Sequence, residues 1–147
     1  MTQEDKQLLL KDLCTRLPYG VKGKCEIDAS YDTSFGTVFQ THKFDAVVCG
    51  LKEDLLFVNP LIENKDEQEF ANEEVTVGAS ILDFNPYLFP MSSMTDEEIK
   101  EYKHLVAFSG SPTGSANFID WLNKNHFDYR GLIPMGLAID ATGLHIY

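Results

Sequence analysis

The densest group of side chains able to do chemistry lies at residues 118–133 (FIDWLNKNHFDYRGLI). Five of them are candidate ligand-binding residues: Trp121, His126, Asp128, Tyr129 and Arg130. An arginine can bind a carboxylate or phosphate through two parallel hydrogen bonds, and an aromatic ring can stack on a ligand. The group follows a predicted helix, where loops often carry function. A structural alternative stays open, in which Asp128 pairs with Arg130, His126 caps the helix and the aromatic rings attach the helix to the sheet.

Other catalytic patterns find little support. The loop GSPTGSAN at 110–117 lacks the GxxxxGK[ST] and GxGxxG spacings, although its backbone amides could hold an anion before a helix. Its simpler interpretation is an ordinary loop with Ser115 or Asn117 as the helix N-cap. Cys25 or Cys49 could be imagined as a nucleophile with His126 and Asp128, but Cys49 alternates with apolar strand residues and is expected to be buried.

The three cysteines and four histidines are scattered, without CxxC, HxH or HExxH spacing. We therefore predict no metal site and no cofactor, and we expect reduced, buried thiols that act as small apolar groups. No catalytic residue is predicted. Enzymatic activity stays open, with a non-enzymatic function favoured.

The acidic residues form the second candidate group. The formal net charge is −11, and the whole excess of negative charge lies in residues 53–101. This segment contains thirteen acidic residues and only two basic ones, Lys65 and Lys100. Such a segment repels phosphate backbones, so we expect no nucleic-acid partner, but it could attract a basic protein. The alternative is a solvated loop and strand face. The candidate partner-binding residues are six acids near its centre: Glu63, Asp66, Glu67, Glu69, Glu73 and Glu74.

The elements that must position these groups run in the order helix, strands, helices. Leucines at helical spacing predict a first helix at 2–17, with Thr2 as its cap and Asp5 at the third helical position. Alternating apolar residues predict short strands at 21–27, 36–41, 44–49, 55–59 and 75–83, with a tight hairpin at 41–43 and an acidic loop at 63–74. A capping box at 95–98 begins the second helix, and a third follows at about 115–126.

This order predicts an α+β fold rather than an alternating α/β fold. We expect one compact domain, 1–147, with a β segment at 21–84 that forms an antiparallel meander or a small SH3-like barrel. A helical segment at 95–127 and a tail at 131–147, either irregular or ending in a strand, complete it. Exposed strand edges could pair chains, but the sequence does not fix an oligomeric state.

The N-terminal residues MTQEDKQLLLKD are acidic and polar, unlike a signal peptide, which begins with basic residues and continues with an apolar stretch. No apolar segment approaches the length that crosses a bilayer. A cytoplasmic protein without a membrane partner is therefore expected.

Three segments together carry a resemblance: LLLKDLCTRLPYGVK at 8–22, PYLFPMSSMT at 86–95 and FIDWLNKNHFDYRGLI at 118–133. In sequence and in order along the chain, they resemble a family of short uncharacterised proteins from gut Bacteroides genomes and their phages or mobile elements. Phe89 departs from the family pattern, in which an arginine is common between the leucine and the proline. The resemblance implies a small cytoplasmic protein encoded in or near mobile DNA, and it implies no catalytic residues.

Three functions follow from these observations. The first is a non-enzymatic protein-interaction module that acts through the acidic segment 53–101. The second is a small ligand-binding protein or enzyme with a pocket near Trp121, His126, Tyr129 and Arg130. The third, ranked last, is an acidic mimic of DNA, because the acids number only 23 of 147 residues and are concentrated in one segment.

Overall fold

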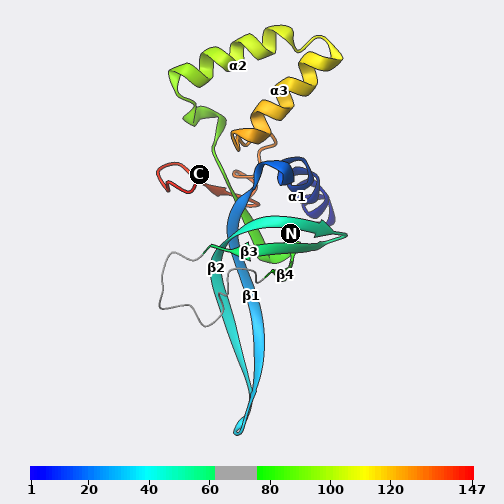
Figure 1. The fold of residues 1–147 in the computed structure, drawn as a ribbon, viewed down its shortest axis with the longest axis vertical. Helices are drawn as coiled ribbons and strands as arrows, with labels where there is room; N and C mark the ends of the chain where they lie inside the picture. The colour runs from blue at the N-terminus through cyan, green and yellow to red at the C-terminus, as the bar shows by residue number, and fades with distance from the viewer. Residues whose placement is uncertain (62–75) are drawn as a thin grey trace. The chain divides into compact units, whose positions relative to one another are not determined.

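The computed structural model describes residues 1–61 and 76–147, apart from the side chains of Ala29 and Tyr31. The elements follow the predicted order, with a helix, then strands, then two further helices (Figure 1). The predicted α+β class is confirmed. The chain groups into two compact units, Met1–Pro86 and Tyr87–Tyr147, and each is described by itself.

The first unit begins with α1 (Gln3–Arg16) and the short helix η1 (Leu17–Tyr19). The predicted cap is present, since the Thr2 hydroxyl accepts from the Asp5 N–H at 3.1 Å and the Asp5 carboxylate accepts from the Thr2 N–H at 2.7 Å. These two bonds satisfy backbone donors that the first helical turn leaves open. Leu9 and Leu13 are buried and attach the helix to the core.

Five strands form the sheet of this unit: β1 (Lys22–Thr33), β2 (Gly36–Lys52), β3 (Leu55–Pro60), β4 (Val77–Ser80) and β5 (Phe84–Leu88). Their order is β4-β3-β2-β1-β5, and each neighbouring pair is antiparallel. Strands β1 to β4 are neighbours in chain order, so the meander is the form that the predicted β segment takes. The short helix η3 (Ile81–Asp83) joins β4 to β5.

The structure corrects the predicted hairpin at 41–43. Strand β2 runs through these residues, and the turn lies at Ser34 and Phe35 instead. Polar residues suggested a turn there, but they occur because both faces of this part of β2 are solvated. Lys43 pairs with Glu26 across the strands at 2.7 Å, and the Thr41 hydroxyl donates to Asp28 at 2.7 Å.

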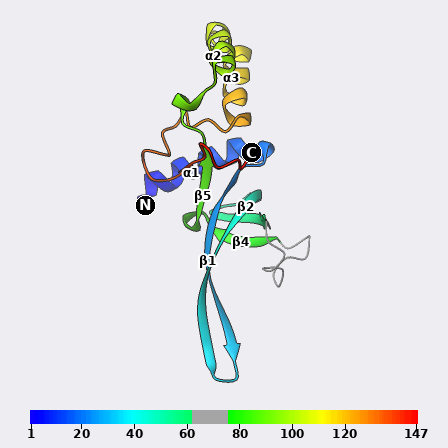
Figure 2. The same ribbon diagram turned by 90° about the vertical axis from the view of Figure 1, so that its left-hand side faces the viewer.

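The far ends of β1 and β2, residues 26–33 and 36–43, form a two-stranded ribbon that we call the arm. Figures 1 and 2 both show the arm extending beyond the other strands of the first unit. Its turn and second strand expose large apolar side chains: Phe35 is 101% exposed, Phe39 80% and Val38 49%. The arm therefore contributes little to the core of this unit.

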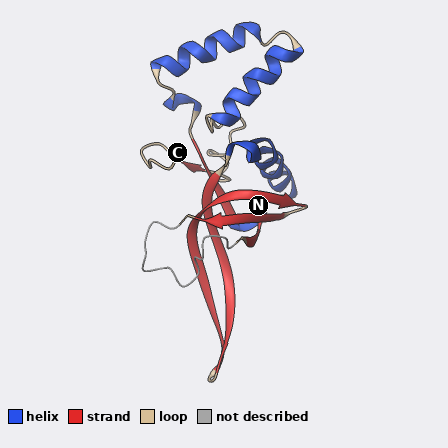
Figure 3. Cartoon of the chain, in the orientation of Figure 1, coloured by secondary structure: helices blue, strands red, loops and turns tan. Residues whose placement is uncertain are grey.

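In the second unit, the end of β5 pairs in parallel with β6 (Ile139–Asp140), the only strand in the predicted tail. The short helix η4 (Met91–Ser93) leads to α2 (Asp96–Phe108). Thr95 and Glu98 form the predicted capping box at the start of α2. Helix α3 (Pro112–Lys124) packs beside α2, with the Tyr102 and Phe118 rings 5.5 Å apart (Figure 3). Of the described helices, none is long and apolar enough to cross a membrane.

The predicted start of the third helix was wrong by one turn. Ser111 is the N-cap of α3, and its hydroxyl accepts from the Gly114 N–H at 3.0 Å. Pro112 then occupies the first helical position, where its fixed φ suits the helix and its missing N–H costs nothing. Ser115 and Asn117, the predicted caps, therefore lie inside the helix.

Candidate functional site

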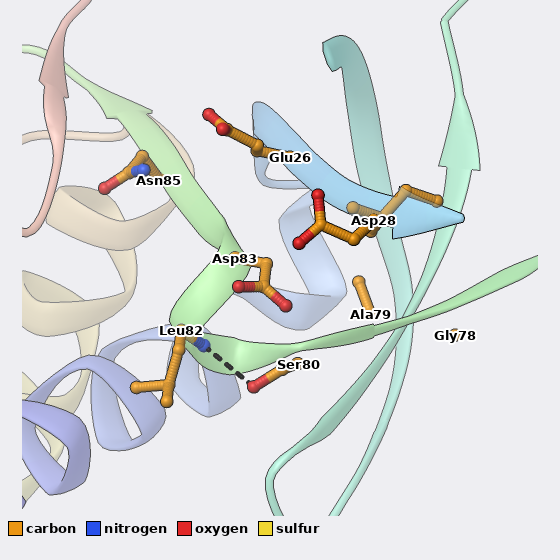
Figure 4. Close-up of a pocket in the computed structure, with 9 residues that line it drawn as sticks. Glu26, Asp28, Gly78, Ala79, Ser80, Leu82, Asp83 and Asn85 are labelled. Carbon is orange, nitrogen blue, oxygen red and sulfur yellow. Dashed lines mark hydrogen bonds between the residues drawn. The ribbon is translucent and has the colours of Figure 1, made fainter. Parts of the chain in front are cut away.

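The first unit contains an acidic cleft of about 420 Å³. One wall is β1, with Glu26, Ile27 and Asp28, and the other is formed by β4, η3 and the start of β5. Figure 4 shows the carboxylates of Asp28 and Asp83 pointing into the same space from these two walls. The remaining lining residues are Gly78, Ala79, Ser80, Leu82 and Asn85.

The cleft begins where β1 loses its neighbour. Strand β5 pairs with β1 only from Gly23 to Cys25, and beyond Cys25 no described strand pairs with this outer edge of β1. The cleft therefore contains an open strand edge as well as acidic side chains. Such an edge presents peptide groups that can accept another strand.

The hydrogen bonds show which residues of β1 present these groups. The Val48 N–H donates to the Val21 carbonyl at 3.0 Å, so odd-numbered residues of β1 direct their peptide groups toward β2. The register then runs without a shift from Lys22↔Val47 to Thr33↔Gly36. Even-numbered residues of β1, including Glu26 and Asp28, therefore direct their N–H and C=O groups to the outer edge.

Local contacts hold the carboxylates of β1 in place. Lys43 Nζ lies 2.7 Å from Glu26 Oε2, and Thr41 Oγ1 donates to Asp28 Oδ1 at 2.7 Å. On the opposite wall, Ser80 Oγ accepts from the Leu82 N–H at 3.2 Å, which orders the start of η3 before Asp83 (Figure 4). The lining thus contains three carboxylates, with Lys43 as the neighbouring base.

Cys25 lies beside this cleft but is unsuited to nucleophilic chemistry. Burial, with a contribution from the nearby Asp83 charge, raises the pKa of the Cys25 thiol to about 11. The thiolate, not the thiol, is the nucleophile, so this cysteine is unreactive near neutral pH. Cys14 and Cys49 are exposed, which corrects the expectation of buried thiols. Cys49 follows the buried Val48, and successive strand residues face opposite sides.

No group of three or more metal-ligating side chains suited to a metal ion occurs in the parts of the chain that the structure describes. The cleft offers carboxylates, a hydroxyl and an amide at an open strand edge. Carboxylates of this kind bind ammonium and guanidinium groups through charge-assisted hydrogen bonds. The chemistry that it supports is recognition of a basic segment.

The predicted ligand-binding residues lie in the second unit, and most serve its turn after α3. His126 has φ 56°, and its N–H donates to the Asn123 carbonyl at 3.1 Å, while the Phe127 N–H donates to the Leu122 carbonyl at 3.0 Å. This pair of bonds is the Schellman helix end, which usually places glycine where His126 lies. The Asp128 carboxylate then accepts from the N–H groups of Leu132 and Ile133, each at 2.8 Å.

The aromatic members of the group pack on one another. Trp121 stacks on Phe127 with ring centroids 5.5 Å apart, and the Tyr129 hydroxyl lies 3.1 Å from Asn123 Oδ1. The guanidinium carbon of Arg130 lies 4.8 Å from the Tyr129 ring centre. These contacts explain why the residues cluster in sequence, because each supports the end of α3.

Of the five, His126 lines a cavity of about 340 Å³ in this unit, and the other four are absent from its lining. The His126 ring stacks on Tyr147 at 3.7 Å between centroids. Besides His126, the cavity is lined by Phe89, Ser93, Thr95, Glu98, Lys124, Asn125, Phe127 and Tyr147.

The six predicted partner-binding acids, Glu63 to Glu74, lie outside the described residues. Sequence reasoning missed Glu26, Asp28 and Asp83 as a group. A signal existed for the first two, since acids at positions 26, 28 and 32 alternate along one strand and so share one face. Asp83 could not be assigned to this group from the sequence, because it is far from β1 along the chain. The pairing of β5 with β1 brings η3, and Asp83 with it, close to that strand.

Comparison with known proteins adds no relative: no protein-family model, curated protein or solved structure matches the chain.

Proposed function

We propose that this chain is a non-enzymatic protein-interaction module that binds a basic segment of a partner protein in the acidic cleft. We further propose that it is a cytoplasmic protein encoded by a mobile element or phage, as its resemblance implies. The observation that carries the binding function is the convergence of Glu26, Asp28 and Asp83 on one cleft at an open strand edge.

The open edge supports binding by strand addition. An extended partner segment would exchange backbone hydrogen bonds with the outward peptide groups of β1, while its side chains supply specificity. Alternate residues of a strand lie about 7 Å apart on one face, as Glu26 and Asp28 do. A segment with lysine or arginine at alternate positions therefore matches this edge in both backbone and charge.

The charge distribution supports the same partner chemistry. The chain carries −11 overall, and the sequence between β3 and β4 holds six of its acids. A concentrated negative charge increases the association rate of a basic partner, and salt weakens that attraction. Capture of the partner should consequently decrease as the salt concentration rises.

The test is capture from native host lysate by the tagged chain and by two double variants. Asp28→Asn with Asp83→Asn removes two charges from the cleft, and Asp96→Asn with Glu97→Gln removes two exposed charges at the start of α2. We expect the first variant to lose a stoichiometric, salt-sensitive partner that the wild type and the second variant retain. Equal capture by both variants would reject the cleft as the binding surface.

A second candidate function rests on the cavity beside His126. Phe89, Phe127 and Tyr147 give it an aromatic lining, and Glu98 and Lys124 add one charge of each sign. A small ligand bound there would change the fluorescence of Trp121, which stacks on Phe127. A metabolite screen with neither a fluorescence change nor a thermal shift would remove this candidate.

A further inference from the structure

The arm has a second open edge, on β2, whose chemistry differs from that of the cleft. Strand β3 pairs with β2 from Ala46 onward, so residues 36–43 have no described strand on their outer side. An isolated two-stranded ribbon is only marginally stable in water. The arm also exposes Phe39 and Val38, which a third strand would partly cover.

The two edges of the arm are protected to different degrees. The outward residues of β1 are Glu26, Asp28, Ser30 and Asp32. On β2, the carbonyl of Asp45 accepts from the Leu61 N–H at 2.7 Å on the outer side, so odd-numbered residues of β2 direct their peptide groups outward. The outward residues of β2 within the arm are therefore Thr37, Phe39, Thr41 and Lys43.

The difference in charge between the two edges determines which of them can pair with the same edge of a second copy. Charged side chains and prolines protect strand edges from pairing, and like charges directly opposite one another repel. Three of the four outward residues of β1 are acidic, so two β1 edges would repel. The outward residues of β2 include one charge, Lys43, at the end of the arm, but no acid and no proline. Threonine and phenylalanine favour strand pairing.

We propose that two copies of this chain pair edge to edge through residues 37–43 of β2, making a symmetric antiparallel four-stranded ribbon from two arms. A two-fold axis at Gln40 would set Phe39 opposite Thr41 and Thr37 opposite Lys43. No like charges then meet at the seam. Lys43 of each copy then lies beside Thr37 of the other. Because the Thr37 hydroxyl donates to Asp32 at 2.8 Å, the positive charge of Lys43 approaches the negative charge of Asp32 across the interface.

The partner that fits this edge is a second copy of the chain, because the edge is complementary to itself. In an isologous interface both copies use the same surface, so no other surface is required. The net charge of −11 opposes association of whole chains. The arm, however, extends beyond the other strands of its unit in both views, and its pairing residues 37–43 include no acid (Figures 1 and 2).

Sedimentation velocity of the purified full chain over a range of concentrations tests this proposal. We expect a reversible change from 16.6 kDa to twice that mass as concentration rises. Thr41→Pro removes an outward N–H and the hydroxyl that donates to Asp28, but no backbone hydrogen bond to β1. Thr41→Val loses the same hydroxyl and keeps the N–H. We expect Thr41→Pro to weaken the dimer roughly a hundredfold, because symmetry removes two hydrogen bonds at roughly tenfold each. Thr41→Val should retain the dimer.

A second pair of variants tests the proposal without proline, because proline could also disturb the arm itself. Phe39→Glu places an acid in the seam and should give a monomer, while Phe35→Glu changes the turn outside the seam and should stay dimeric. A wild-type monomer at every concentration, equal masses within either pair, or assemblies larger than two would overturn the proposal. The cleft lies on the other edge of the arm, so failure here leaves the proposed partner binding to its own test.

Discussion

At the scale of single residues, several side chains that suggested chemistry serve the fold instead. His126 occupies a left-handed position at the end of α3, and Asp128 satisfies two backbone donors in the following turn. The sequence showed that these residues cluster, but helix ends and binding loops use the same residue types. Only the hydrogen bonds distinguish the two uses. The cleft acids Glu26 and Asp28, by contrast, could have been found from their alternation along a strand.

Cys25 gives a prediction about pH. Burial raises its pKa from 9.0 to about 11, so the folded state favours the protonated thiol. Its contribution to stability is complete below pH 9 and is lost as the pH rises toward 11, because the unfolded chain releases the proton first. Denaturation curves at several pH values should show this loss, and Cys25→Ser should remove it. A Cys25→Ser variant with the same pH dependence as the wild type would contradict the assignment.

Asp12 and Arg16 form an ion pair that the sequence interpretation overlooked. Both side chains are 0% exposed, with Arg16 Nε 2.7 Å from Asp12 Oδ2 and Arg16 Nη2 3.2 Å from Asp12 Oδ1. Their spacing of four residues allows a pair on one helix face. The sequence alone does not reveal that this pair is buried, since only tertiary packing shows which face of the helix enters the core.

We expect Asp12→Asn to destabilise the protein by about 3–5 kcal/mol, because a buried charge then loses its counter-ion. The double variant Asp12→Leu with Arg16→Met should be much less destabilised, since it removes both charges. Lys6→Ala, which breaks the exposed pair with Asp54, provides the control and should have little effect. Urea denaturation measures all three. A double variant at least as unstable as Asp12→Asn would disprove the coupling.

At the scale of elements, the starts of α1 and α2 were more predictable than the strands. The capping boxes at Thr2 and Thr95 act within four residues, so the sequence determines them almost alone. The extent of β2 depends on its register with β1, which no local pattern records. Its polar residues at 41–43 therefore resembled a turn. Strand β5 was missed because Pro86 lies within it and Pro90 follows it, and prolines are unusual in strands.

Gly23 tests how closely β5 lies against β1. A β-carbon at this position would overlap the Phe84 ring and lie 2.5 Å from the Asn85 carbonyl oxygen. We expect Gly23→Ala to destabilise the first unit by roughly 1–3 kcal/mol, as overpacking of a close contact does. Gly110→Ala is the comparison, because nothing lies within 4 Å of a β-carbon there and Gly110 has no positive φ. Thermal denaturation in which Gly23→Ala melts with the wild type would contradict this packing.

At the scale of the whole molecule, the sequence predicted the class of fold and the excess of negative charge. It did not predict where charge and open backbone coincide, because Glu26 and Asp83 are far apart in sequence and meet only through the sheet. The acidic segment suggested a basic partner, and the cleft adds a backbone edge at which such a partner could bind. The two open edges of the arm then have separate proposed roles, one for a basic segment and one for a second copy.

Residue-resolved hydrogen exchange, measured by NMR with and without the captured partner, tests the central claim most directly. Strand addition in the cleft predicts slower exchange at the outward amides of β1, those of Glu26, Asp28 and Ser30, when the partner is bound. The outward amides of β2, those of Thr37, Phe39 and Thr41, should keep the rates that they have without partner. Unchanged exchange at the β1 amides in a saturated complex would contradict the account.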